Sequence, residues 1–250
     1  MKSVMKQIIF SSMLLLIIPS SAWIFGWQWQ LTHADSNLLK GLFGVTQTAG
    51  YSWGILTCIL LSACFLRCLR FRLKVALQFL VLLLILMVIG QTVKIIMKNQ
   101  IKEPRPFLVC LEKKHHIENK NFYSLNIEPR TVLLKRLLKS ETNAPTWLKK
   151  YWQAETGFSF PSGHSIFAAS WALLAVGLLW PLRYYKTVIF LMLWSSGVMI
   201  SRLLLGMHWP IDIFVSILIS SLLSILSCWV VYRWIDPIPL NKKKVLTLID

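Results

Sequence analysis

Apolar runs close to the length of a membrane-spanning helix constrain the fold of this 250-residue chain more than any other feature. A helix needs about 20 mostly apolar residues to cross the hydrocarbon core of a bilayer. Hydrophobic residues make up 56% of the chain and charged residues only 15%, far from the average of soluble domains. The runs predict six transmembrane helices, at residues 8–28, 51–66, 75–97, 164–181, 187–206 and 212–232.

The runs predict an all-α integral membrane protein, because a helix satisfies its own backbone hydrogen bonds in lipid. We expect a bundle of six transmembrane helices with a mostly helical insertion on the outer face, between the third and fourth spans. The predicted parts are residues 1–97 with spans one to three, residues 98–163 as the outer segment, residues 164–235 with spans four to six, and residues 236–250 as a cytoplasmic tail.

Basic residues flank the predicted spans on one side, which predicts the orientation. Lys and Arg in short loops tend to stay in the cytoplasm, whereas segments of about 60 residues cross with little regard for charge. We therefore give the short loops more weight than the basic outer segment. The flanking residues are Lys2, Lys6, Arg67, Arg70, Arg72, Lys74, Arg183, Lys186, Arg233, Lys242, Lys243 and Lys244.

The N-terminal run has an alternative interpretation as a cleaved signal peptide. Lys2 and Lys6 precede an apolar run that ends in Pro19-Ser20-Ser21-Ala22. However, three tryptophans between residues 23 and 29 are typical of an interfacial anchor, and no clear cleavage site is present. We expect the first span to be retained.

Three motifs carry residues suited to binding an anion, and the predicted topology puts them all at the outer face. The first is Lys98, followed by six residues and Arg105-Pro106, directly after the third span. Pro104 and Pro106 stop a helix and hold the backbone around Arg105 extended. A basic cluster that only anchors the span is the alternative for this motif alone.

The second motif is Phe160-Pro161-Ser162-Gly163-His164, directly before the fourth span. Serine is favoured at the start of a helix, and glycine lets a ligand approach the backbone. The free N–H groups of a helix start favour an anion, with His164 beside it. The alternative is an ordinary capped span with a histidine at the interface.

The third motif is Ser201-Arg202, five residues, His208, three residues and Asp212. Pro210 is best placed as the first residue of the next helix. We therefore expect Asp212 in the first turn of that helix, reaching back to the His208 ring. An interfacial loop whose arginine extends to the headgroups is the alternative.

Together the motifs resemble the three signatures of the type-2 phosphatidic acid phosphatases, the lipid phosphate phosphatase family. The signatures are intact and in order over residues 98–212, and six spans with a segment between the third and fourth fit the plan of that family. The resemblance implies a phosphatase that works through a phosphohistidine, with no metal and no other cofactor.

The resemblance also implies a role for each motif residue. His208 would attack phosphorus, Asp212 would hold the other ring nitrogen, and His164 would transfer protons to and from the leaving group and water. The residues that would bind the substrate phosphate are Lys98, Arg105, Ser162, Gly163 and Arg202.

The substrate implied by the family is a membrane lipid phosphate. Candidates are phosphatidylglycerophosphate, undecaprenyl diphosphate, diacylglycerol diphosphate, phosphatidate and lysophosphatidate. The family also implies the bacterial inner membrane, with several spans and the active site facing the periplasm. A lipid phosphotransferase of the same fold and a transporter that uses the buried charges as a relay remain alternatives.

The outer segment contains an amphipathic pattern at residues 132–139. It fits a helix on anionic lipid, with Trp147, Tyr151 and Trp152 at the same interface, or a helix packed on the segment's own small core. His115 and His116 lack a third metal ligand in the sequence, and we expect solvated loop residues there.

The formal net charge of +17 does not require nucleic acid as a partner. Membrane topology, anionic lipid and the phosphate site account for it. Only Cys110 lies in the outer segment, so we expect no outer-face disulfide within the chain. The pattern leaves the oligomeric state open.

Overall fold

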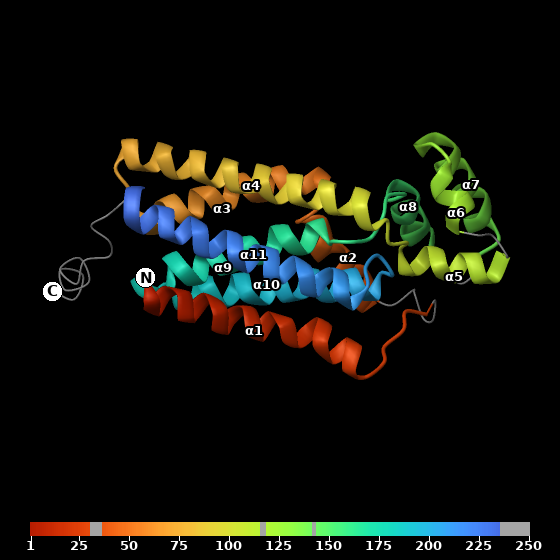
Figure 1. The fold of residues 1–250 in the computed structure, drawn as a ribbon, viewed down its shortest axis with the longest axis horizontal. Helices are drawn as coiled ribbons and strands as arrows, with labels where there is room; N and C mark the ends of the chain where they lie inside the picture. Colours follow the sequence, from red (N-terminus) through yellow and green to blue (C-terminus); the bar gives the residue numbers. More distant parts are fainter. Residues whose placement is uncertain (31–36, 116–118, 142–143, 236–250) are drawn as a thin grey trace.

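The computed structural model describes residues 1–30, 37–115, 119–141 and 144–235, and these residues form helices with no strand. The all-α prediction is confirmed for this part of the chain. Figure 1 shows the long helices side by side in a bundle, with the short helices α5 to α8 gathered at one end. Residue His116 and the predicted cytoplasmic tail at 236–250 lie outside the described residues.

The bundle contains apolar helices of two lengths. Four segments are long and apolar enough to cross a membrane: Lys2–Ile24, Leu73–His115, Tyr185–Leu204 and Pro210–Ile235. Two shorter apolar helices, Trp53–Leu69 and Gly163–Leu178, correspond to the second and fourth predicted spans. The structure therefore supports a membrane protein with four spans by length, and two of the six predicted spans fall short of that criterion.

The elements follow the chain in a simple order. The bundle helices are α1 (Lys2–Ile24), α3 (Tyr51–Leu69), α4 (Leu73–Ile101), α9 (Gly163–Leu178), α10 (Tyr185–Leu204) and α11 (Pro210–Val230). The other elements are α2 (Asn37–Gln47), α5 (Pro106–His115), α6 (Asn119–Ser124), α7 (Ile127–Lys139), α8 (Thr146–Ala154), the 3₁₀ turn Trp180–Leu182 and the π-helical turn Val231–Ile235.

Helix α9 forms the centre of the bundle and packs against α1, α10 and α11. Almost all of its residues are buried, as expected of a helix that is apolar on every side. Three serines of α11, Ser216, Ser220 and Ser224, donate hydrogen bonds to α9-side carbonyls at a constant offset of 54 residues. Small residues and interhelical hydrogen bonds of this kind hold helices together in lipid, where apolar burial alone gives little.

The outer helices α5 to α8 share a second, smaller core. Leu134 and Leu138 of α7 are buried in it, together with Trp152 of α8 and Phe107 of α5. The amphipathic pattern at 132–139 is therefore explained by packing within the outer segment. Our placement of Trp152 at a lipid interface was wrong, because the indole is fully buried.

The loop between α10 and α11, which carries His208, is held by the outer segment. Four consecutive carbonyls, from Leu204 to Met207, each accept a hydrogen bond from outside the loop. The donors are, in the same order, the indole N–H of Trp29 (2.9 Å), the indole N–H of Trp152 (3.0 Å), the backbone N–H of Phe107 (3.0 Å) and the guanidinium of Arg105 (3.3 Å).

We predict that Gly206→Ala loosens this loop. Gly206 has φ +70°, and a Cβ at this position would lie 2.5 Å from the Trp29 ring. A side chain here meets both backbone strain and overpacking, which together cost about 2 kcal/mol or more. The melting temperature of the purified protein in detergent should fall.

The matched control is Gly41→Ala, because no atom lies within 4 Å of a Cβ built there. The control should leave the melting temperature unchanged or raise it slightly. Equal melting temperatures for both variants would contradict the tight contact of Trp29 with the loop.

Candidate active site

A cavity of about 650 Å³ opens between the bundle and the outer helices, and it collects residues from all three sequence motifs. Six of the eight predicted site residues line it: Lys98, Arg105, Gly163, His164, Arg202 and His208. The other two, Ser162 and Asp212, are buried next to lining residues. Segments more than 100 residues apart in the chain thus meet in one site.

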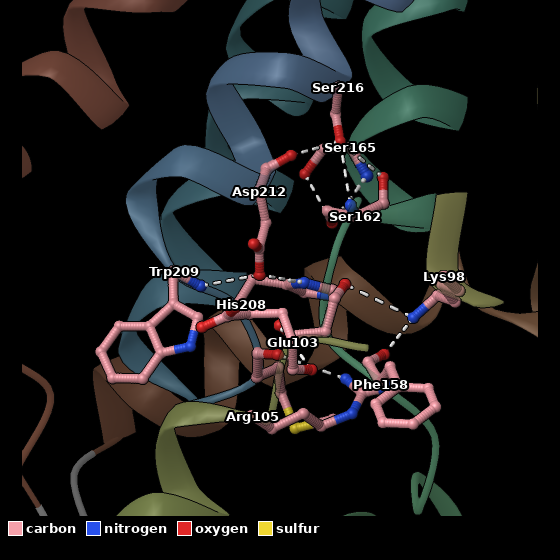
Figure 2. A network of polar contacts seen from close by, with 12 residues as sticks. Lys98, Glu103, Arg105, Phe158, Ser162, Ser165, His208, Trp209, Asp212 and Ser216 are labelled. Carbon is pink, nitrogen blue, oxygen red and sulfur yellow. Dashed lines mark hydrogen bonds and ion pairs between the residues drawn. The ribbon is translucent and has the colours of Figure 1, made fainter. Parts of the chain in front are cut away.

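His208 and Asp212 form a hydrogen-bonded pair, which Figure 2 shows from close by. The Nδ1 atom of His208 lies 3.1 Å from Oδ2 of Asp212. The same carboxylate oxygen accepts the backbone N–H of Trp209 at 2.9 Å, which caps the start of α11. Pro210 is the first residue of that helix, so Asp212 lies in its first turn, as the sequence predicts.

The surroundings of His208 keep its ring neutral. The side chain is 2% exposed, and burial together with the nearby charges of Arg202 and Arg105 lowers its pKa well below the usual value. Because Nδ1 faces a carboxylate, it carries the ring proton, and Nε2 keeps a free lone pair. A neutral imidazole with one free nitrogen is the form that can act as a nucleophile.

Arg105 is fixed by the backbone. Its Nε donates to the carbonyl of Gly157 at 2.7 Å, and Nη1 donates to that of Met207 at 3.3 Å. Nη2 forms an ion pair with Glu155 at 2.8 Å. Lys98, at the end of α4, donates to the carbonyls of Phe158 and Ser159 on the same connecting strand of chain.

Arg202 is fully buried and only partly satisfied. Its Nη1 donates to the hydroxyl groups of Tyr151 and Thr46, and its guanidinium lies 5.6 Å from the centre of the Tyr151 ring. Its Nε and Nη2 atoms have no hydrogen-bond partner among the described residues. Because a buried donor without a partner is costly, these atoms favour an anion in the cavity.

The second motif begins α9. Ser162 is the N-cap residue, and its hydroxyl accepts from the backbone N–H of Ser165 at 3.3 Å and contacts the Ser165 hydroxyl at 2.9 Å. The hydroxyl is therefore used inside the helix cap, in contrast to the phosphate contact expected from the sequence. Gly163 lines the cavity, and a Cβ there would meet the Lys94 side chain at 2.8 Å, so the close packing requires glycine.

Four site residues escaped sequence reasoning: Thr46, Lys94, Tyr151 and Glu155. Lys94 and Glu155 line the cavity, and Tyr151 contacts Arg202 from α8 instead of facing an interface. Lys94 precedes Lys98 by one helical turn on α4, and this spacing was the one available signal. The other three are brought in by segments whose positions depend on tertiary packing.

Glu155 is an anion among cations. Burial raises the pKa of its carboxyl group, but the positive charges of Arg105 and Arg202 outweigh that effect and bring the pKa to about 2. The carboxylate is therefore ionised at any pH at which the protein is folded in a cell. Among the described residues that line the cavity, it is the single carboxylate.

Comparisons with known proteins agree with this site. Residues 79–236 match the PAP2 superfamily. The chain is 48% identical over 238 residues to phosphatidylglycerophosphatase B of Escherichia coli K12, which covers 95% of this chain and 93% of the relative. It is 33% identical over 231 residues to phosphatidylglycerophosphatase B of Haemophilus influenzae, which covers 88% of this chain and 92% of that relative.

The matched region contains all three motifs and every helix that contributes a predicted site residue, from α4 to α11. The resemblance inferred from the motifs is therefore confirmed. The chain belongs to the PAP2 superfamily.

Proposed function

We propose that this protein is a metal-independent membrane lipid phosphatase that works through a phosphohistidine at His208. The observation that carries the proposal is the His208–Asp212 pair at 3.1 Å, next to a cavity lined by Lys98, Arg105 and Arg202. A neutral nucleophile with an orienting carboxylate beside three cations suits transfer of a phosphoryl group.

The first half-reaction moves the phosphoryl group to the protein. Nε2 of His208 attacks phosphorus, and the bond to the lipid oxygen breaks. Asp212 stabilises the positive charge that develops on the ring. His164, on the cavity wall, donates a proton to the departing lipid alcohol.

The second half-reaction regenerates the free histidine. His164, now neutral, takes a proton from a water molecule as the water oxygen attacks phosphorus. The phosphorus–nitrogen bond of His208 breaks, and inorganic phosphate is released. The net reaction converts a lipid phosphate and water into a lipid alcohol and phosphate.

Fixed cations stabilise the charge on the transferred group. Lys98, Arg105 and Arg202 surround the cavity, and the two unpartnered N–H atoms of Arg202 suit phosphate oxygens. The N-terminus of α9 at Gly163 adds backbone N–H donors. These groups take the part that a metal ion plays in other phosphatases.

The walls of the cavity favour a lipid as substrate. Beyond the charged residues the cavity continues along α3 and α4, where its lining is apolar and includes Ile55, Ile59, Leu80, Leu83, Leu84 and Met87. A phosphate-bearing headgroup at the charged end and an acyl or prenyl chain along the apolar walls would both be accommodated.

The relatives suggest which lipid is used. Phosphatidylglycerophosphatase B, the name of the relatives above, points to phosphatidylglycerophosphate. Undecaprenyl diphosphate is a second candidate, because an outer-face site would meet a carrier lipid that is recycled on that side. Diacylglycerol diphosphate, phosphatidate and lysophosphatidate carry the same terminal phosphate and complete the proposed range.

The proposed topology is six spans in a bacterial inner membrane, with the site facing the periplasm. The basic residues at the starts of α1, α4 and α10 support this orientation. Figure 1 shows the start of α1 and the turn between α3 and α4 at the end of the bundle opposite to α5 and α7. The short helices α3 and α9 would be the second and fourth spans.

We predict that His208→Ala abolishes hydrolysis of phosphatidylglycerophosphate, with a loss of about 10³-fold or more because the nucleophile is removed. Phosphate release by purified protein in detergent micelles measures the rate. A rapid-quench experiment with phosphate-labelled lipid should leave acid-labile label on the unmodified protein and none on the variant. A variant that keeps its melting temperature and near-normal turnover would refute the mechanism.

We predict that excess EDTA leaves the turnover rate within about twofold, because Lys98, Arg105 and Arg202 already supply the positive charge that a metal would bring. The same lipid assay gives the answer, with a Mg²⁺-dependent phosphatase as positive control for chelation. Loss of activity that only Mg²⁺ restores would count against the fixed-cation site.

We predict that Cys58→Trp, on the apolar wall of the cavity, raises KM for the long-chain lipid by about tenfold because it fills the space for the chain. Hydrolysis of p-nitrophenyl phosphate, which has no chain, should change by less than about twofold. Leu60→Trp, on the exposed side of the same helix, is the matched control. Equal effects on both substrates would place the lipid chain elsewhere.

A further inference from the structure

Glu155 lies where substrate phosphate is expected to bind. It follows α8 directly, and its side chain lines the same cavity as Lys98, His164 and Arg202. About 30% of the side chain is exposed, and the cavity is the space that it lines. Its carboxylate is bonded to Nη2 of Arg105 at 2.8 Å. A carboxylate thus already pairs with one of the cations needed for the phosphate.

Arg105 does not depend on Glu155 for its position. Two backbone carbonyls, of Gly157 and Met207, hold its Nε and Nη1 atoms. These bonds fix the plane of the guanidinium and leave Nη2 facing Glu155. The ion pair is therefore the one contact of Arg105 that a phosphate could replace without moving the guanidinium.

The charge of Glu155 also acts on the rest of the site. Arg202, His164 and Lys98 each influence its titration, as does Arg105, so the carboxylate lies within electrostatic range of all of them. A phosphate dianion in the cavity would be attracted by the cations and repelled by this carboxylate. The repulsion is strong in a buried site, because the effective dielectric constant is low.

We propose that Glu155 is an internal competitor of phosphate: it occupies Arg105 when the site is empty, yields it to the substrate phosphate, and weakens retention of inorganic phosphate after hydrolysis. The inference rests on the proposed phosphatase function and deepens it. Three cations without a counter-charge would bind the product as tightly as the substrate. Uniformly tight binding of that kind does not accelerate turnover.

Replacement by glutamine tests the proposal. Glu155→Gln removes the charge and nearly keeps the shape, and the backbone bonds keep Arg105 in place. Orthophosphate is the probe, titrated calorimetrically into the purified full-length protein in detergent. We expect its affinity to rise by about tenfold or more in the variant, because one buried like charge is removed. Its inhibition constant in the lipid assay should fall by the same factor.

The matched control is Glu128→Gln, which removes the same charge from an exposed position on α7. Its orthophosphate affinity should equal that of the unmodified protein. Glu155→Ala serves as the second variant, with the same expected direction. Melting temperatures verify that each protein is folded.

Unchanged or weaker orthophosphate binding in both Glu155 variants would overturn the proposal, and weaker binding would assign Glu155 a positioning role on Arg105. Calorimetry reads binding without turnover, so this failure is separate from that of the proposed function. An unmodified protein that hydrolyses no lipid phosphate would remove the function and this inference together. Equal phosphate affinities in an active protein would remove only this inference.

Discussion

The contact between the starts of α9 and α11 is the interaction on which the site depends. The hydroxyl of Ser216 accepts the backbone N–H of Ser162 at 2.9 Å and lies 2.6 Å from the carbonyl of Asp212. One buried side chain therefore links the second motif to the third (Figure 2). In lipid, where apolar packing between helices has little driving force, a hydrogen bond of this kind fixes the relative position of two helices. His164 and His208 are brought to one cavity through it.

A second constraint is the electrostatic cost of burying cations. Arg202 is fully buried with two unpartnered N–H atoms, and Arg105 is 4% exposed. Buried charges are tolerated when they are paired, and the site pairs them with the carbonyls of Gly157 and Met207 and with Glu155. The empty site is thus held together by groups that occupy some of the donors needed for phosphate. Binding of the substrate exchanges part of these contacts.

The sequence predicted the parts of the site that local rules determine. Pro210 can only begin a helix at this point, and that rule placed Asp212 in the first turn and its carboxylate against His208. The same reasoning failed for the Ser162 hydroxyl, because a serine at a helix start can cap its own helix or face a ligand, and local sequence does not distinguish the two. Glu155 and Tyr151 could not be predicted, since α8 reaches the cavity only through its packing in the outer core.

The alternative interpretations of the outer segment were decided by tertiary contacts of the same kind. A helix with one apolar face packs equally well on lipid or on protein, and its moment is the same in both cases. Burial of Leu134 and Leu138 against Trp152 selects the protein. The outer core then orients Trp152 so that its indole N–H reaches the carbonyl of Leu205, next to the loop of the nucleophile. The segment that sequence reasoning treated as peripheral thus helps to position His208.

The length of α9 relates the fold to the substrate. Its 16 residues span about 24 Å, less than the roughly 30 Å of the hydrocarbon core. A short helix is tolerated because α9 is surrounded by protein, so its ends need not reach the headgroup region on their own account. Its first turn can then end inside the bundle, against the cavity, with its free N–H groups directed at a ligand instead of bulk water. A phosphate carried by a lipid can reach such a site while its chain stays between α3 and α4, so the short central helix suits a substrate that never leaves the membrane.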